Sequence, residues 1–170
     1  FIVSSLLLGV SGSWLGGSLV WGWLSPFPIL HIPVEAVALP LAFIGLSTNW
    51  KIGSSFYISS LFGTAITDLT IFLTGIMDQW REVITADSEN APLILQQTSE
   101  NLIHIKSLSI IIIVAVILWF ISKEIFDSAS IHTTNGKALL VASYVIQTTL
   151  VVDGIFVVLA ILQPTFSGLV

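Results

Sequence analysis

The chain has 170 residues, of which 55% are hydrophobic and 9% are charged, and its mean hydropathy is +0.99. Water-soluble domains contain about 25% charged residues, so this composition excludes a soluble enzyme and predicts an integral membrane protein. The net charge of −5, from ten acidic and five basic residues, excludes the basic face that nucleic-acid binding needs, and the absence of cysteine excludes disulfides and thiolate chemistry.

Five apolar stretches are long enough to cross a bilayer as helices, which takes roughly 20 residues each. The first covers residues 1–24 and ends before Pro26 and Pro28, because proline removes a backbone donor and disfavours helix in the residue before it. The others are expected at residues 33–49, 55–77, 108–122 and 137–163. The chain opens inside an apolar run, at Phe1, so we expect a transit or signal segment to precede it. The sequence predicts a single all-α domain, residues 1–170, that forms an integral membrane bundle of about five helices.

The long connection between the third and fourth spans holds most of the charged residues. Pro92 opens a segment in which apolar and polar residues are mixed up to Ile105. A short helix lying on the membrane surface would explain this pattern, and an ordinary loop is the alternative. In either case we expect the connection to lie in water or at the membrane interface.

Three acidic residues, Glu35, Asp68 and Asp153, fall in or near the spans. Carboxylates at bilayer depth are costly, so these residues are candidates for proton or cation transport if they converge on a water-accessible cavity. The alternative is structural, because a protonated carboxyl that is hydrogen-bonded to Ser or Thr on another helix holds a bundle together. For both interpretations we expect Asp68 and Asp153 to face the protein interior and to contribute to helix packing.

The first span contains small residues and tryptophans that predict close contacts. Gly12, Gly16 and Gly17 form a small-xxx-small pattern, which lets another helix approach closely. Trp21 and Trp23 lie near the end of the span and are typical of an interfacial aromatic belt. With Trp14 they are also candidate contacts for a flat pigment ring.

His31, His104 and His132 fall at or beyond the ends of the expected spans. A neutral imidazole can be the axial ligand of a chlorophyll magnesium or a haem iron. No two of these histidines can be placed across the bilayer from each other to bind a haem. We therefore consider them as ligands of chlorophyll, with His31 the first candidate and His104 the second. His132 lies in a Ser/Thr/Asn loop and is expected to be solvated. The sequence contains no phosphate loop, metal-protease motif or catalytic triad, so we expect no catalytic residues and no protein-bound metal.

Several short runs resemble an uncharacterised membrane-protein family of cyanobacteria and plastids, domain of unknown function 3120. The runs that carry the resemblance are Gly12–Ser18, Trp21–Leu24, His31–Ala36, Ser60–Ala65 and Thr67–Leu69, with a second match at Val152–Gly154. The resemblance covers about residues 10–82 well and then fades. It implies a thylakoid location, and we expect the plastid of an alga. It carries no catalytic residues, and the chain lacks the Glu-x-x-His/Asn-x-x-Gly-x-Arg pattern of antenna helices.

Three functions are consistent with these features. The first is an accessory subunit of a photosynthetic complex, similar to the extra photosystem I subunits of red-lineage algae. Such a subunit would contact lipids, neighbouring subunits, antenna proteins, and a few chlorophylls and carotenoids. The second is a small transporter or channel that uses Asp68 and Asp153. The third is a photosystem assembly factor, which the sequence does not distinguish from the first.

Overall fold

The computed structural model describes residues 2–87 and 89–162, and every regular element within these residues is helical. Five of its stretches are long and apolar enough to cross a membrane: Ile2–Leu24, Pro28–Gly45, Lys51–Leu73, Ile105–Asp127 and Thr134–Leu162. The expected all-α bundle with five membrane spans is therefore confirmed. The expected outer ends of the first and last spans, Phe1 and Gln163, lie outside the described residues.

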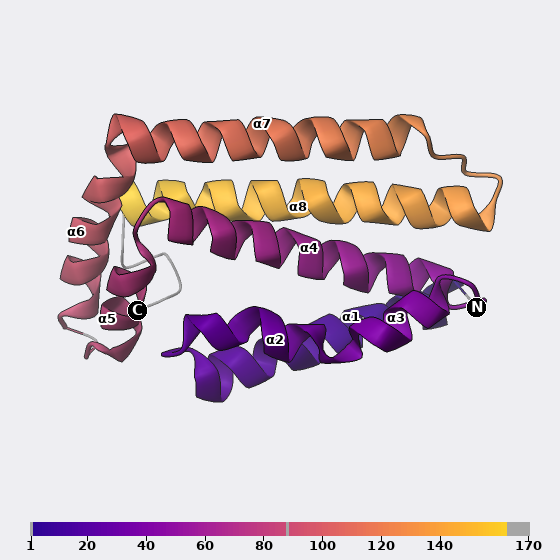
Figure 1. Ribbon diagram of the computed structural model, residues 1–170, viewed down its shortest axis with the longest axis horizontal. Helices are drawn as coiled ribbons and strands as arrows, with labels where there is room; N and C mark the ends of the chain where they lie inside the picture. Colours follow the sequence, from indigo (N-terminus) through magenta and orange to yellow (C-terminus); the bar gives the residue numbers. More distant parts are fainter. Residues whose placement is uncertain (1, 88, 163–170) are drawn as a thin grey trace.

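The central helix of the bundle is α4 (Lys51–Leu73). Figure 1 shows α7 (Ile105–Asp127) and α8 (Thr134–Leu162) on one side of it, and α1 (Ile2–Leu19), α2 (His31–Glu35) and α3 (Leu39–Gly45) on the other. Two helices, α5 (Met77–Thr85) and α6 (Ala91–Ile103), lie across one end of the bundle. The long polar connection therefore caps this end of the membrane-spanning helices.

The second span begins at Pro28, five residues earlier than expected. It consists of short helical segments in series: η2 (Pro28–Leu30), α2, η3 (Ala36–Ala38) and α3. Pro28 and Pro40 each lie at the start of a segment, where a missing backbone donor costs little. The prolines therefore start new segments without ending the span. As a result His31, expected at a span end, lies in the first turns of the second span.

The third span is shifted toward the N-terminus, from the expected residues 55–77 to Lys51–Leu73. Gly75 has a positive φ of 78°. Its N–H donates to the Phe72 carbonyl at 3.0 Å, and the Ile76 N–H donates to the Ile71 carbonyl at 3.2 Å. These two bonds form a Schellman motif, which ends a helix and is favoured by glycine at this position.

Helices α1 and α4 cross through backbone contact at glycine. A Cβ atom added to Gly53 would collide with the Ser5 backbone, and one added to Gly9 would collide with the Gly53 backbone. At the same crossing the Gly53 N–H donates to Ser5 Oγ at 2.9 Å, and Ser5 Oγ donates to the Trp50 carbonyl at 3.0 Å. Ser5 therefore satisfies a free backbone donor in the first turn of α4, as a capping side chain would.

Helices α7 and α8 are joined by a pair of fully buried serines. Ser143 Oγ donates to the Ser122 carbonyl at 2.9 Å, and the two hydroxyl oxygens lie 3.0 Å apart. Gln147 Nε2 donates to Ser122 Oγ at 2.9 Å. Hydrogen bonds between spans replace the hydrophobic driving force, which is absent inside a bilayer.

The capping helices are held to the bundle by a small apolar cluster. Val83 of α5, Leu95 of α6 and Ala160 of α8 are each buried and pack together, with Ile94 against them. The segment after Pro92, for which a short helix or a loop was expected, is helical and forms α6.

Candidate functional site

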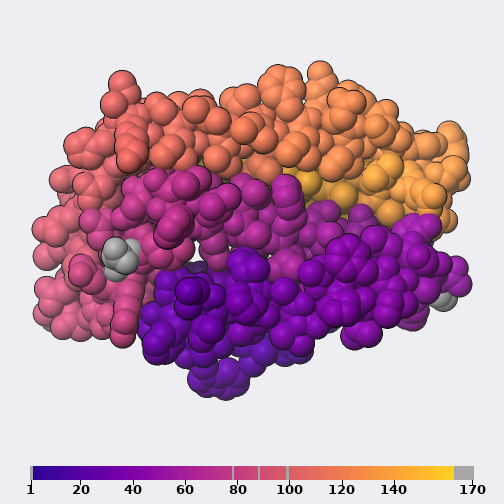
Figure 2. Space-filling model, viewed as in Figure 1, coloured from indigo at the N-terminus to yellow at the C-terminus, as the bar shows by residue number. Residues whose placement is uncertain are grey.

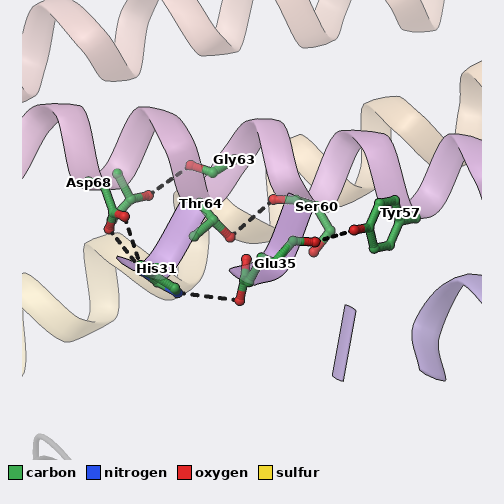
Figure 3. Close-up of polar contacts among 8 residues, drawn as sticks. His31, Glu35, Tyr57, Ser60, Gly63, Thr64 and Asp68 are labelled. Atoms are coloured by element: carbon green, nitrogen blue, oxygen red, sulfur yellow. Dashed lines mark hydrogen bonds and ion pairs between the residues drawn. The ribbon is translucent and has the colours of Figure 1, made fainter. Parts of the chain in front are cut away.

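His31 lies between two carboxylates that come from different helices. Its Nδ1 atom is 3.0 Å from Asp68 Oδ2 and 3.2 Å from Asp68 Oδ1, across the α2–α4 contact. Its Nε2 atom is 3.3 Å from Glu35 Oε1, one helical turn further along α2. All three side chains are largely shielded, with exposed fractions of 18% for His31, 13% for Glu35 and 19% for Asp68. Figure 3 shows the acid–imidazole–acid row in the space between the two helices.

Glu35 is held in place by helix α1 and by Tyr57. A Cβ atom added to Gly16 would lie 3.1 Å from Glu35 Cα, and one added to Gly17 would lie 3.4 Å from Glu35 Oε1. The Tyr57 hydroxyl donates to the Glu35 backbone carbonyl. The glycines at the end of α1 therefore leave room for an acidic side chain of α2, while Gly12, one turn earlier, faces the Tyr57 ring.

The fourth ionisable residue, Asp153, enters from helix α8. Its Oδ2 atom accepts a hydrogen bond from Thr67 Oγ1 at 2.6 Å. Asp153 and Asp68 line the same cavity. Thr67 and Asp68 are consecutive in α4, so this one turn of helix presents a hydroxyl toward α8 and a carboxylate toward α2.

Asp68, Asp153 and His31 line one cavity of about 420 Å³, which we call the outer cavity. Its other walls are Val20, Trp21, Ser25, Pro28, Thr67, Ile71, Met77, Trp80, Val152 and Phe156. Trp21 belongs to η1 (Val20–Leu24), a turn of π-helix that continues α1, and Trp80 belongs to the capping helix α5. Figure 2 shows that the surface is hollowed along the junction between the N-terminal helices and α4.

A second, more apolar cavity of about 240 Å³, the inner cavity, adjoins the first between α4, α7 and α8. The two cavities share Thr67, Ile71, Trp80, Asp153 and Phe156. Asp153 is the one acidic residue among the described walls of the inner cavity. Asp153 therefore lies where the outer cavity meets the more apolar inner cavity.

The charge of the cluster is unbalanced. Glu35, Asp68 and Asp153 can carry three negative charges, and His31 can carry one positive charge. Among the residues described, neither lysine nor arginine lines the outer cavity. Arg81, a base of the adjacent helix α5, instead places its guanidinium over the Phe27 ring, 5.7 Å from the ring centre. Net negative charge within a bilayer is costly, so the arrangement suits the binding of protons or of another cation.

The cluster is shaped as a row and does not enclose a single point. The two carboxylates approach opposite edges of the His31 ring, so they cannot share one ion with it. No three histidine, cysteine or acidic side chains of the described residues gather as ligands for one metal ion. The geometry therefore favours passing protons along the row.

The candidate chlorophyll ligands differ in their surroundings. Both ring nitrogens of His31 contact carboxylates, so binding a magnesium ion would require breaking one of these contacts. His104 lies exposed at the junction of α6 and α7, and His132 lies exposed in the α7–α8 loop. Only His31 is part of the cluster.

The tryptophans of the first span face different directions. Trp14 and Trp23 are 76% and 75% exposed, as expected for side chains that meet lipid or a partner. Trp21 is half exposed and makes an edge contact with Trp80, with ring centres 6.0 Å apart.

Sequence reasoning identified the three acids singly but missed their association with His31. The available signal was the His31–Glu35 spacing of four residues, which places two side chains on one helix face. It was overlooked because the proline at position 33 was expected to begin the helix. No spacing of this kind links Tyr57 to Glu35 or Thr67 to Asp153 in the sequence.

Fold and site together define a polytopic membrane protein with an ionisable cluster inside its helical bundle. The chain belongs to the family described as protein of unknown function (DUF3120), whose model matches residues 2–161. The similarity expected over residues 10–82 therefore extends over nearly the whole chain. Neither a curated protein nor a solved structure matches it.

Proposed function

We propose that this protein is a small transporter or channel that moves protons across its membrane. The supporting observation is the row formed by Asp68, His31 and Glu35, which lies inside the spans and begins at the outer cavity. Ionisable residues inside spans mark ion pathways and proton relays. Asp153 adds a second carboxyl to the same cavity, and none of the described walls besides His31 is basic.

The row can pass one proton without leaving charge behind on the imidazole. A protonated Asp68 gives its proton to His31 Nδ1, and the Nε2–H of the ring gives its proton to Glu35 Oε1. The ring is then protonated on Nδ1 and must regain the tautomer that is protonated on Nε2 before the next cycle. Each transfer crosses a distance of 3.0–3.3 Å.

A stripe of polar side chains continues this row along α4. Tyr57, Ser60, Thr64 and Asp68 are spaced by three or four residues, so they share one face of the helix. Figure 3 shows Tyr57 and Asp68 facing α2, with the Tyr57 hydroxyl at the Glu35 carbonyl. Ser60 lines a groove between α4, α1 and α8. The stripe supports a path that leads from the outer cavity toward the opposite half of the bundle.

Proton flux into liposomes tests this function. Purified protein should dissipate an imposed pH gradient faster than protein-free liposomes do, and His31→Gln should lower the rate to near the protein-free value. The glutamine amide can form hydrogen bonds but cannot take up and release a proton at neutral pH. His132→Gln, in the exposed loop, is the matched control and should keep the wild-type rate. Equal rates for wild type and His31→Gln would refute the relay.

A second candidate function is that of an accessory subunit that contacts pigment in a photosynthetic complex of the thylakoid membrane. A groove of about 530 Å³ on the outside of the bundle is lined by Trp14, Trp21 and Phe56, with Val10, Ser13, Gly17 and Ser18. Aromatic side chains over small residues suit a flat apolar ring. The resemblance to a family of oxygenic phototrophs supports the same interpretation.

This second function makes a separate prediction for native membranes. The protein should remain with photosystem I after detergent and salt washing, and Trp14→Ser should weaken that association by removing the most exposed ring of the groove. Trp119→Ser, on the lipid face of α7 and 56% exposed, is the control. Migration of the wild-type protein free of pigment and of photosystem subunits would contradict this function.

A further inference from the structure

We infer that the outer cavity binds an organic ammonium ion, which exchanges with protons at Asp68 and Asp153. This inference deepens the proposed transport function and rests on it, because it names the second cation of the same site. Three features carry it: aromatic faces, unbalanced carboxylates and an adjoining apolar space.

The aromatic walls form an angled cage. Trp21 and Trp80 meet edge to face with ring centres 6.0 Å apart and planes at 71°, and Trp80 and Phe156 meet at 6.3 Å and 65°. All three rings line the outer cavity. The face of an aromatic ring attracts cations, and several rings at right angles are a common way to bind substituted ammonium groups.

The carboxylates supply the charge that such a cage needs. Asp68 and Asp153 line the same cavity as the rings, and the described walls contain no basic residue besides His31. Inorganic cations such as calcium need six to eight oxygen ligands that converge on one point. Here Asp68 is turned to His31 and Asp153 to Thr67, and no three histidine, cysteine or acidic side chains of the described residues gather around one ion. An alkylammonium ion, which is weakly hydrated on its carbon side, fits a wall of two acids and three rings better than a bare metal ion does.

The inner cavity indicates which substituent the ammonium ion has. It begins at Asp153 and Trp80, extends between α4, α7 and α8, and has a volume of about 240 Å³. An apolar cavity of about 150 Å³ is enough to bind benzene. The ligand class is therefore an ammonium ion with a small aromatic or branched aliphatic substituent, its charge near Asp153 and its apolar part in the inner cavity.

Equilibrium binding of radiolabelled benzyltrimethylammonium to the protein in lipid nanodiscs tests the inference, with empty nanodiscs as the background. Saturable binding should exceed that of tetramethylammonium, which lacks the apolar part, and potassium should compete poorly. Asp153→Asn and Trp80→Leu should each weaken binding by about tenfold, while Trp80→Phe should retain most of it. Trp119→Leu should leave binding unchanged, because Trp119 is not a wall of either cavity.

The outcomes separate this inference from the proposed function. Binding no stronger than that of empty nanodiscs, or unaffected by Asp153→Asn, would overturn the inference, while proton flux that depends on His31 would still support transport. Saturable binding without proton flux, both in the absence and in the presence of benzyltrimethylammonium, would instead leave the ligand site standing and refute transport. If Trp80→Leu does not fold, as judged by gel filtration, the nearly isosteric Asp153→Asn decides the question.

Discussion

Asp68→Asn is expected to leave the protein folded in the membrane and to lower its proton flux to the rate of protein-free liposomes. The asparagine side chain can still form a hydrogen bond with His31 Nδ1, since its amide offers both a donor and an acceptor. Hydrogen bonds between spans contribute only about 0.6 kcal/mol on average, so the folding loss should be small. The amide cannot ionise, however, so the row loses the group that receives protons from the outer cavity.

The measurement combines gel filtration in detergent with the liposome flux assay. Asp127→Asn is the matched control, because this carboxyl lies exposed at the end of α7, away from the cavity. It should behave as the wild type in both assays. A folded Asp68→Asn variant with full proton flux would show that Asp68 acts through helix packing alone.

Gly53→Ala is expected to destabilise the protein strongly, because it adds a methyl group where α1 and α4 are in backbone contact. The new Cβ atom would collide with the backbone carbonyl of Ser5, and a backbone cannot move aside as a flexible side chain can. Adding methyl groups to well-packed sites usually costs about 1–3 kcal/mol. We expect the upper end of this range or more, because separation of α1 from α4 would also break the Ser5–Gly53 hydrogen bond.

Unfolding by SDS in mixed micelles measures this loss. Gly154→Ala is the matched control, since Gly154 is also helical but a Cβ atom there meets nothing within 4 Å. It should be neutral or slightly stabilising, because alanine is the better helix former by roughly 1 kcal/mol. Equal unfolding free energies for the two variants would contradict close backbone packing at the α1–α4 crossing.

The expected loss at Gly53 bears on the site as well. Helix α1 supplies the surface against which Glu35 rests, through Gly16 and Gly17. If α1 moves away from α4, Glu35 loses this support and Trp21 leaves the outer cavity. Gly53→Ala should therefore lower both proton flux and stability, whereas Asp68→Asn should lower proton flux with little change in stability.

Composition and hydropathy alone determined that this chain is a helical membrane protein with five spans. A bilayer imposes length and apolar character on each span, and both properties are local and additive along the sequence. The same reasoning identified Glu35, Asp68 and Asp153 as unusual, because an acid without a partner is costly at that depth in any fold. Helix ends were less accurate, as the Schellman motif at Gly75 and the segmented helix after Pro28 show.

Only the tertiary structure decided which residues meet. The contact of His31 with Asp68 joins residues 37 positions apart, and that of Thr67 with Asp153 joins residues 86 positions apart. Such contacts depend on how α2, α4 and α8 are rotated about their own axes. The close contacts at Gly9, Gly53 and Gly63 hold α4 against α1 and α8, and the contact of Gly16 with Glu35 holds α2 against α1. A rotation of one helix by a single residue, about 100°, would turn an acid from the cavity toward lipid, and no local property of the sequence specifies it.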